Sequence, residues 1–128
     1  MNPNGDKSVR PKGEKSNYFV LGIAIMGQPI DHQTRCKHYH TPFDIVAIKF
    51  KCCDQYFPCY SCHEETVSHP VEVWRKEERD KKAVLCGVCG YEMTIDQYLA
   101  SRDQCPVCRS HFNPNCSKHY HLYFQLSH

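Results

Sequence analysis

Cysteine and histidine are concentrated in one stretch of this 128-residue chain, TRCKHYHTPFDIVAIKFKCCDQYFPCYSCHEETVSH, which runs from Thr34 to His69. Thiolate sulfur and imidazole nitrogen are the ligands that zinc prefers in proteins, usually four to a site in a tetrahedron. Eight side chains of the stretch have this chemistry, which is enough for two complete sites. These candidate ligands are Cys36, His38, Cys52, Cys53, Cys59, Cys62, His63 and His69.

Two of the candidate ligands, Cys62 and His63, are neighbours in the chain, and the side chains of adjacent residues tend to point apart. We therefore expect them to bind different metals, which makes the two sites interleaved rather than successive. The preferred partition is Cys36, His38, Cys59 and Cys62 for one site, and Cys52, Cys53, His63 and His69 for the other. Because Cys52 and Cys53 are also adjacent, they could instead be divided between the sites, and this alternative stays open.

A second cysteine pattern, Cys86-x-x-Cys89 followed after fifteen residues by Cys105-x-x-Cys108, is a strong signature of a four-thiolate zinc site. Each C-x-x-C turn places two sulfurs on one side of a tight loop, and two such turns facing each other complete a tetrahedron. The alternatives are disulfides or a redox-active C-x-x-C pair. A redox pair normally belongs to a thioredoxin-like scaffold, and the sequence has no βαβ pattern to build one.

A leftover group near the C-terminus, Cys116, His119 and His121, could form most of a fourth zinc site. If this segment is an extended strand, both histidines lie on the same face, as joint ligation requires. His40, or as a second choice His32, could complete the set. The alternative is that these are polar surface residues. A fourth site would raise the expected metal content from three zinc ions to four.

The order of the ligands argues against a RING domain, the zinc cross-brace of many ubiquitin ligases. A RING needs a C-x-x-C pair ahead of its C-x-H element, whereas here Cys36-x-His38 comes first and no cysteine precedes it. We therefore expect no intrinsic ubiquitin-ligase activity. A zinc hydrolase is not expected either, because it needs an open coordination position, while the ligand pattern closes all three sites.

The elements that must position these ligands are short. Residues 18–30 predict a strand or hairpin arm, and residues 44–51 and 83–86 predict strands. The segment TIDQYLA begins with Thr94 and has Gln97 three residues later, which is typical of a capping box and predicts a short helix. The alternating segment HYHLYFQL predicts a C-terminal strand. The expected fold class is a small, zinc-stabilised α+β domain of short strands and turns with one short helix.

We expect one compact unit preceded by a polar tail. Residues 1–17 predict disorder and lack the apolar segment of a secretory signal. Residues 18–82 would hold the two interleaved zinc sites, including a turn-rich segment over 54–69, and residues 83–128 would hold the four-cysteine module and the C-terminal strand. With little apolar mass to bury, the chain would gain rigidity from its metals, because a structural zinc contributes about 10–16 kcal/mol in small peptides.

The formal net charge of +2 is not the charge of a zinc-loaded protein. Zinc-bound cysteines are thiolates, so nine of them with three zinc ions would bring the net charge to about −1. This value does not support the basic surface that nucleic-acid binding normally requires. No apolar run is long enough to span a membrane, and the expected partner is a protein client.

The residues CKHYH…FKCC…YFPCYSCHEE…H, followed by CPVCRSHFNPNCSKHYHLYF, resemble the CHY-type zinc finger family, named for its Cys-x-His-Tyr opening. The resemblance covers about residues 31–124. It extends to the short stand-alone members of bacteria and fungi, which include a fungal helper of the small Tim chaperones in the mitochondrial intermembrane space. It implies three zinc ions on the twelve ligands named above, in a CHY finger followed by a zinc-ribbon or rubredoxin-like C-x-x-C module.

The expected function is a zinc-binding protein-interaction module without catalytic activity. The resemblance to the fungal helper implies, as a hypothesis, zinc transfer or thiol protection for cysteine-rich clients. Two alternatives stay open: a nucleic-acid-binding zinc module, and an accessory factor in ubiquitination that lacks a RING. The expected compartment is the cytoplasm, or the mitochondrial intermembrane space if the protein is eukaryotic. The sequence specifies neither the client nor the oligomeric state.

Overall fold

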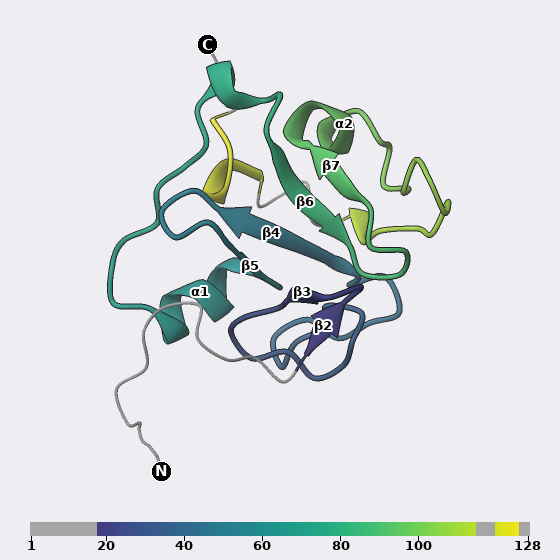
Figure 1. Ribbon diagram of the computed structural model, residues 1–128, viewed down its shortest axis with the longest axis horizontal. Helices are drawn as coiled ribbons and strands as arrows, with labels where there is room; N and C mark the ends of the chain where they lie inside the picture. The colour runs from purple at the N-terminus through teal and green to yellow at the C-terminus, as the bar shows by residue number, and fades with distance from the viewer. Residues whose placement is uncertain (1–17, 115–119, 126–128) are drawn as a thin grey trace.

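The computed structural model describes residues 18–114 and 120–125, and its centre is a four-stranded antiparallel sheet (Figure 1). The strands lie in the order β5 (Gln55–Phe57), β4 (Val46–Phe50), β6 (Lys82–Cys86) and β7 (Glu92–Thr94). β4 lies inside the sheet, where Ile48 pairs with Phe57 of β5 on one side and with Val84 of β6 on the other. Strands from both halves of the chain therefore share one sheet.

The strand residues divide between two cores, one on each face of the sheet. Successive side chains of a strand point to opposite faces, so Val46, Ile48 and Phe50 join the larger core, which also includes cysteines of the zinc motifs. Ala47 joins a smaller core with Leu85. The strand expected here, with its three large apolar side chains on one face, is confirmed.

A small hairpin covers the second face of the sheet. β2 (Phe19–Val20) pairs antiparallel with β3 (Ile23–Ala24), and Ile25, just beyond β3, packs into the smaller core. The turn between them has positive φ at Leu21 (47°) and Gly22 (84°). Two positive φ angles are typical of a tight type I′ hairpin turn, in which glycine adopts this conformation without strain. The expected hairpin is confirmed.

The helix expected after β7 is present as α2 (Ile95–Leu99). The Thr94 side chain accepts a hydrogen bond from the Gln97 N–H at 3.0 Å, and the Gln97 side chain accepts one from the Thr94 N–H at 2.9 Å. This reciprocal pair is the capping box that the sequence predicts. Ile95 and Tyr98 are buried in the larger core and anchor the helix.

A second helix, α1 (Tyr60–Thr66), lies within the segment that the sequence predicts to be turn-rich. Its N-cap is Cys59, whose sulfur accepts a hydrogen bond from the Cys62 N–H at 3.3 Å. Helix N-caps are normally Ser, Thr, Asp or Asn, so a cysteine cap gives no signal in the sequence. The expectation of one helix is therefore incomplete, and a 3-10 turn over Lys76–Glu78 adds a further helical element.

The C-terminal strand expected from HYHLYFQL is wrong for the residues described, because residues 120–122 form a helical turn. The Tyr120 carbonyl accepts a hydrogen bond from the Phe124 N–H at 2.9 Å, which fixes a turn instead of an extended backbone. A parallel bridge joins Phe124 to Trp74. The rings of Tyr120 and Phe124 pack against Tyr98, so these aromatic residues contribute to core packing rather than to a sheet.

The overall class, a small α+β domain of short strands and turns, is confirmed. Figure 1 shows α1 beside β5 and α2 beside β7, so each helix accompanies an edge strand. Residues 1–17, for which disorder is expected, lie outside the described residues. Within the described ranges, no helix has both the length and the apolar character needed to cross a membrane.

Candidate metal centres

Twelve cysteine and histidine side chains are gathered into three groups of four. In each group the potential ligand atoms all lie within 4.8 Å of one another. Group 1 is Cys36, His38, Cys59 and Cys62; group 2 is Cys52, Cys53, His63 and His69; group 3 is Cys86, Cys89, Cys105 and Cys108. The structure thus brings together the same sets as the preferred partition, with the adjacent Cys52 and Cys53 in one group.

The distances within group 1 match the edges of a zinc tetrahedron. With Zn–S bonds of about 2.3 Å and Zn–N bonds of about 2.0 Å, two sulfurs lie about 3.8 Å apart, and a sulfur and a nitrogen about 3.5 Å. The Cys36 and Cys59 sulfurs are 3.7 Å apart. Nδ1 of His38 lies 3.8, 3.4 and 3.5 Å from the sulfurs of Cys36, Cys59 and Cys62. These donors are therefore spaced to hold one zinc ion.

The ring of His38 is oriented by a carboxylate on its other side. Nε2 of His38 lies 3.0 Å from Oε2 of Glu65 in α1, and the second oxygen of Glu65 lies 3.4 Å from Lys37 Nζ. A hydrogen bond from Nε2–H to Glu65 leaves Nδ1 unprotonated, which is the tautomer that a metal needs. Burial lowers the pKa of His38, but hydrogen bonds to Glu65 and Cys36 outweigh it and raise the pKa overall.

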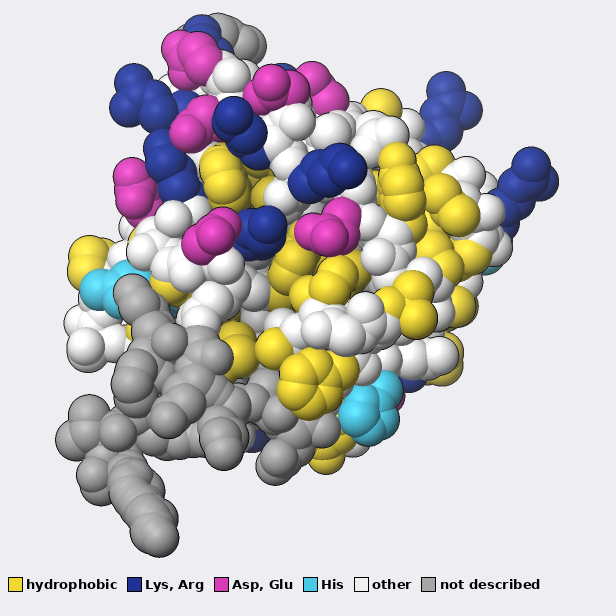
Figure 2. Space-filling view, in the orientation of Figure 1, with side chains coloured by type: hydrophobic (Ala, Val, Ile, Leu, Met, Phe, Trp, Pro, Cys, Tyr) yellow, Lys and Arg dark blue, Asp and Glu magenta, His cyan; other side chains and the backbone are white. Residues whose placement is uncertain are grey.

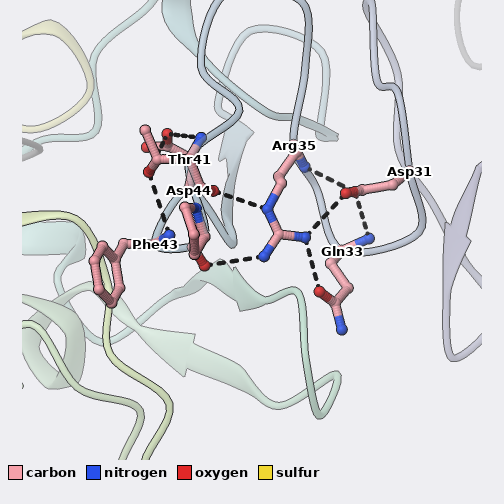
Figure 3. Close-up of polar contacts among 7 residues, drawn as sticks. Asp31, Gln33, Arg35, Thr41, Phe43 and Asp44 are labelled. Carbon is pink, nitrogen blue, oxygen red and sulfur yellow. Dashed lines mark hydrogen bonds and ion pairs between the residues drawn. The ribbon is translucent and has the colours of Figure 1, made fainter.

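The loop that carries the first two ligands of group 1 is tied together by Arg35 (Figure 3). Its guanidinium donates hydrogen bonds to the carbonyls of Thr41 and Pro42, at 2.8 and 2.9 Å, and to Oδ2 of Asp31 at 2.9 Å. The planar, fork-shaped guanidinium makes these bonds in several directions at once. The Arg35 side chain therefore joins the segment that precedes Cys36 to the segment that follows His38.

Asp44 connects the same loop to the second half of the chain. This buried carboxylate accepts hydrogen bonds from the N–H and Oγ1 of Thr41 at 2.8 and 2.7 Å, and from Nδ2 of Asn113 at 2.9 Å. A buried carboxylate is tolerated only where hydrogen bonds compensate for its lost hydration. The network holds the ligand-bearing loop against the residues that follow the second C-x-x-C turn.

Group 2 combines a turn, helix α1 and the segment beyond the helix. Cys52 and Cys53 lie in the turn after β4, with their sulfurs 3.9 Å apart, and Nε2 of His63 lies 3.1 Å from the Cys52 sulfur. The His63 ring is fully buried and stacks on Phe50 at 4.3 Å between centroids. Nε2 of His69 is buried without a hydrogen-bond partner among the described residues, as expected of an atom that binds a metal.

Group 3 lies where two C-x-x-C turns face each other. The sulfurs of Cys86 and Cys108 are 3.7 Å apart, as are those of Cys89 and Cys105, which again matches the edges of a zinc tetrahedron. The Cys105 sulfur accepts hydrogen bonds from the N–H groups of Val107 and Cys108 at 3.4 and 3.5 Å. Hydrogen bonds of this kind are stronger when the acceptor is charged, so they favour the thiolate.

The structure does not support the disulfide and redox alternatives. The described cysteines are all unbridged, and the 3.7 Å separations in groups 1 and 3 are far longer than the about 2.05 Å of a disulfide. The described sheets are antiparallel throughout, so they contain no βαβ unit of the thioredoxin kind.

Crowding and burial oppose the ionisation of several of these thiols. Hydrogen bonding to Cys36 and Cys59 raises the pKa of Cys62, and burial raises the pKa of Cys86 and Cys89. In group 1, hydrogen bonding with Cys59 and Cys62 lowers the pKa of Cys36. Without a cation, ionisation of one sulfur in a group therefore opposes ionisation of its neighbours. A divalent metal would supply the charge that lets all the sulfurs bind as thiolates.

The fourth metal site expected near the C-terminus stays a prediction. Cys116 and His119 lie outside the described residues. His121 and His40 are described, and both are exposed.

Three residues that support the ligands are not among the candidates predicted from the sequence. Glu65 could have been found, because it lies three residues after Cys62 and therefore on the same face of a helix. No spacing rule indicates Arg35. Gly27 has φ of +90°, and a Cβ atom there would lie 2.6 Å from the Cβ of Cys62, so only glycine lets the chain pass this ligand so closely.

Comparison with known protein families gives a match that includes all three groups. The model of the CHY zinc finger family matches residues 36–123 of this chain. No solved structure matches the chain.

Two kinds of named protein are among the relatives of this chain. Helper of Tim protein 13 from Saccharomyces cerevisiae is 50% identical over 109 residues, which are 83% of this chain and 94% of the relative. The protein of the same name from Kluyveromyces lactis is 46% identical over 100 residues, 78% of this chain and 87% of the relative. A probable E3 ubiquitin-protein ligase from Oryza sativa subsp. japonica is 31% identical over 80 residues, 59% of this chain but 24% of the ligase.

Proposed function

This chain belongs to the CHY zinc finger family, and from that premise we propose that it is a non-catalytic adaptor that binds three zinc ions and exchanges zinc with, or shields the thiols of, a cysteine-rich client. The observation that carries the proposal is the set of three four-residue groups whose donor atoms lie within 4.8 Å of one another, with sulfurs at tetrahedral spacing in groups 1 and 3. CHY-type zinc binding follows from the family and these groups. The assignment of the individual zinc ligands and the identity of the client are what we propose.

The proposed zinc ligands are the members of the three groups: Cys36, His38, Cys59 and Cys62; Cys52, Cys53, His63 and His69; and Cys86, Cys89, Cys105 and Cys108. Zinc with four protein ligands has no open position for a reactive water, so it would supply rigidity rather than Lewis-acid chemistry. The interleaved sites and the four-cysteine module would act as one unit. The reason is that β4, from the first half of the chain, pairs with β6, the strand that ends at the group 3 residue Cys86.

The carboxylates beside the metal groups support a non-catalytic role. Glu65 is engaged by His38 and Lys37, and Glu64 accepts a hydrogen bond from the Tyr60 hydroxyl at 3.0 Å. A zinc hydrolase needs a carboxylate or histidine that can act as a base beside an open metal position. Neither glutamate is placed for that task.

The proposed class of client follows from the relatives. Two proteins named helper of Tim protein 13 match most of this chain, and this chain covers most of each of them. We extend their named role to this chain: its client is a small Tim protein or a similar cysteine-rich chain whose thiols must stay reduced or release zinc. This role would place the protein in the mitochondrial intermembrane space, and the cytoplasm is the alternative compartment.

The surface charge favours a protein client over nucleic acid. Figure 2 shows basic and acidic side chains interspersed on the face in view rather than a surface of one sign. Lys51 lies 2.9 Å from Glu78 and 3.7 Å from Glu72, and Lys49 lies 3.9 Å from Asp54. Lysines paired in this way contribute little to phosphate binding. An accessory role in ubiquitination is the second candidate, because the rice ligase shares part of this chain.

Zinc movement between purified proteins tests the proposal. Native mass spectrometry of the reduced protein should show three bound zinc ions. After partial zinc depletion, mixing with a reduced, zinc-loaded small Tim protein should give a complex or transfer zinc to this chain. The oxidised Tim protein has no free thiols to bind zinc and is the control. Three zinc ions without any complex or transfer would contradict the client assignment.

A further inference from the structure

We propose that group 2 is the exchangeable zinc site, and that the edge formed by the Cys52 and Cys53 sulfurs is where an incoming thiol reaches the metal. Groups 1 and 3 would then be the permanent structural sites. This inference rests on the proposed function, because it names the site through which zinc passes between this chain and a cysteine-rich client.

Group 2 has three partly exposed ligands, compared with two in group 3 and one, His38, in group 1. Cys52, Cys53 and His69 are partly exposed, and only His63 is fully buried. In group 1 all three cysteines are buried, and in group 3 one cysteine of each C-x-x-C turn is buried. Zinc can expand its coordination from four ligands to five, so an incoming ligand can bind before an old one leaves. Such a step requires an open edge, which group 2 provides.

Three of the four ligands of group 2 come from turns or bends of the backbone, and the fourth, His63, lies in α1. Cys52 and Cys53 lie in the turn between β4 and β5, and His69 lies in a bend beyond the end of α1. Group 1 has Cys62 inside α1 and Cys59 as its cap. In group 3, Cys89 and Cys108 also lie in turns, but Cys86 is the last residue of β6 and pairs with Val46 of β4. Turns open locally at a lower free-energy cost than paired strands or helices in a core. The backbone therefore permits group 2 to open first.

The two interleaved groups depend on α1 to different degrees. Cys59 caps α1 and Cys62 lies in its first turn, so zinc in group 1 fixes the start of a seven-residue helix that is too short to persist alone. His63 gives group 2 one ligand, and its ring is held independently by Phe50 at 4.3 Å and Phe57 at 5.1 Å. Zinc can therefore leave group 2 while α1 stays in place. Loss of zinc from group 1, by contrast, would unfold α1 and so release the zinc of group 2 as well.

The numbers of thiolate ligands in the three groups also favour release of zinc from group 2. Group 2 offers two thiolates and two neutral imidazoles, whereas group 1 offers three thiolates and group 3 offers four. Fewer anionic donors attract a dication less strongly. In the exchange step a client thiolate bonds to zinc as the bond to Cys52 or Cys53 breaks. The released thiolate then takes up the proton that the client thiol gave up, so the step needs neither an oxidant nor a reductant.

The order of zinc release from the wild-type protein tests the inference directly. The three-zinc protein is mixed with a limiting amount of a synthetic Cys-x-x-Cys dithiol peptide, followed by native mass spectrometry and pulsed alkylation with N-ethylmaleimide. We expect a two-zinc species in which Cys52 and Cys53 are alkylated at least about tenfold faster than the cysteines of groups 1 and 3. First alkylation at Cys89 and Cys108, or loss of all three ions in one step, would overturn the inference.

A matched pair of double variants assigns the rapidly released ion. Cys53→Ser with His69→Ala removes two ligands from group 2, and we expect two bound zinc ions and no rapid release to the peptide. Cys89→Ser with Cys108→Ser removes the two partly exposed ligands of group 3, and we expect rapid release to remain. A rapid phase that survives in the first variant or disappears in the second would contradict the assignment.

The outcomes also separate this inference from the proposed function. If the dithiol peptide removes zinc from group 2 first but a small Tim protein neither binds nor exchanges zinc, the client is wrong and the exchangeable site stands. If the Tim protein exchanges zinc but group 3 is alkylated first, the function stands and this inference is wrong.

Discussion

Cys62 and His63 are consecutive residues of α1, and both are fully buried, yet their side chains belong to different metal groups. Neighbours on a helix point about 100° apart, since there are 3.6 residues in each turn, so one short helix can serve two metals. Zinc in group 1 would set the start of α1, and α1 in turn presents His63 to group 2. The two interleaved sites are therefore coupled through α1, and the coupling of their zinc affinities is reciprocal.

Emptying group 1 should also release the zinc of group 2, whereas group 1, with three thiolates, should bind tightly enough to keep its zinc when group 2 is empty. We expect Cys62→Ser to lose the group 1 ion and to reduce zinc retention in group 2 as well, because α1 loses its anchor. His69→Ala should lose one ion only. Native mass spectrometry of both variants, with amide exchange of residues 60–66, measures the difference. Retention of two tightly bound ions by Cys62→Ser would contradict the linkage.

Glu65 should set the tautomer of His38. Removing the carboxylate in Glu65→Ala should weaken zinc binding in group 1 by about tenfold, the lower end of the effects seen when such supporting residues are lost. Glu65→Gln keeps a hydrogen-bond acceptor and should recover most of the affinity. Competition with a chromogenic chelator measures the affinity, and ¹⁵N shifts of the His38 ring report the tautomer. An unchanged ring signal in Glu65→Ala would show that Glu65 has no orienting role.

Gly27 and Gly22 form a matched pair for the effect of crowding on a ligand. Both have strongly positive φ, +90° and +84°, so alanine should cost about 1–2 kcal/mol at either position. At Gly27 the new methyl group would also meet Cys62, whereas at Gly22 nothing lies within 4 Å. We expect Gly27→Ala to lose a further about 1–3 kcal/mol from overpacking and to release the group 1 zinc faster. Equal thermal stability of the two variants would count against the close approach.

The forked shape of the Arg35 guanidinium, as well as its charge, should contribute to the stability of the zinc-loaded protein. Arg35→Ala removes charge-assisted hydrogen bonds to the carbonyls of Thr41 and Pro42, each worth about 1.5–3 kcal/mol. Arg35→Lys keeps the charge but lacks the fork and should recover little stability. Thermal unfolding of the zinc-loaded variants, with chelator-driven release from group 1, measures both effects. Full rescue by lysine would show that charge alone is sufficient.

The metal groups could be predicted from the sequence because metal ligands leave a spacing signal. Adjacent ligands such as Cys62 and His63 indicate interleaved sites, and C-x-x-C pairs indicate a closed tetrahedron. The β-strands and α2 could be predicted for a similar reason, since apolar alternation and the Thr94–Gln97 box are local features.

The elements that escaped prediction depend on contacts between distant residues. α1 was missed because its cap is Cys59, whose sulfur also faces a metal group. The C-terminal strand was wrong because Tyr120 and Phe124 pack on Tyr98 from a turn. Arg35 supports the ligand loop through hydrogen bonds that no local pattern indicates. The helical spacing of Glu65 from Cys62 could have been noticed, but its contact with His38 joins residues distant in the chain. In each case a tertiary or metal contact outweighs the local propensity.

Exhaustive removal of zinc under reducing conditions tests the central claim most directly, namely that metal groups hold this fold together. Backbone amide exchange is followed before and after chelation, in a buffer that keeps every cysteine reduced. The account predicts that the paired amides of β4 and β6 lose their protection as zinc leaves and regain it when zinc is restored. A stripped protein whose β4 and β6 amides stay fully protected would contradict it.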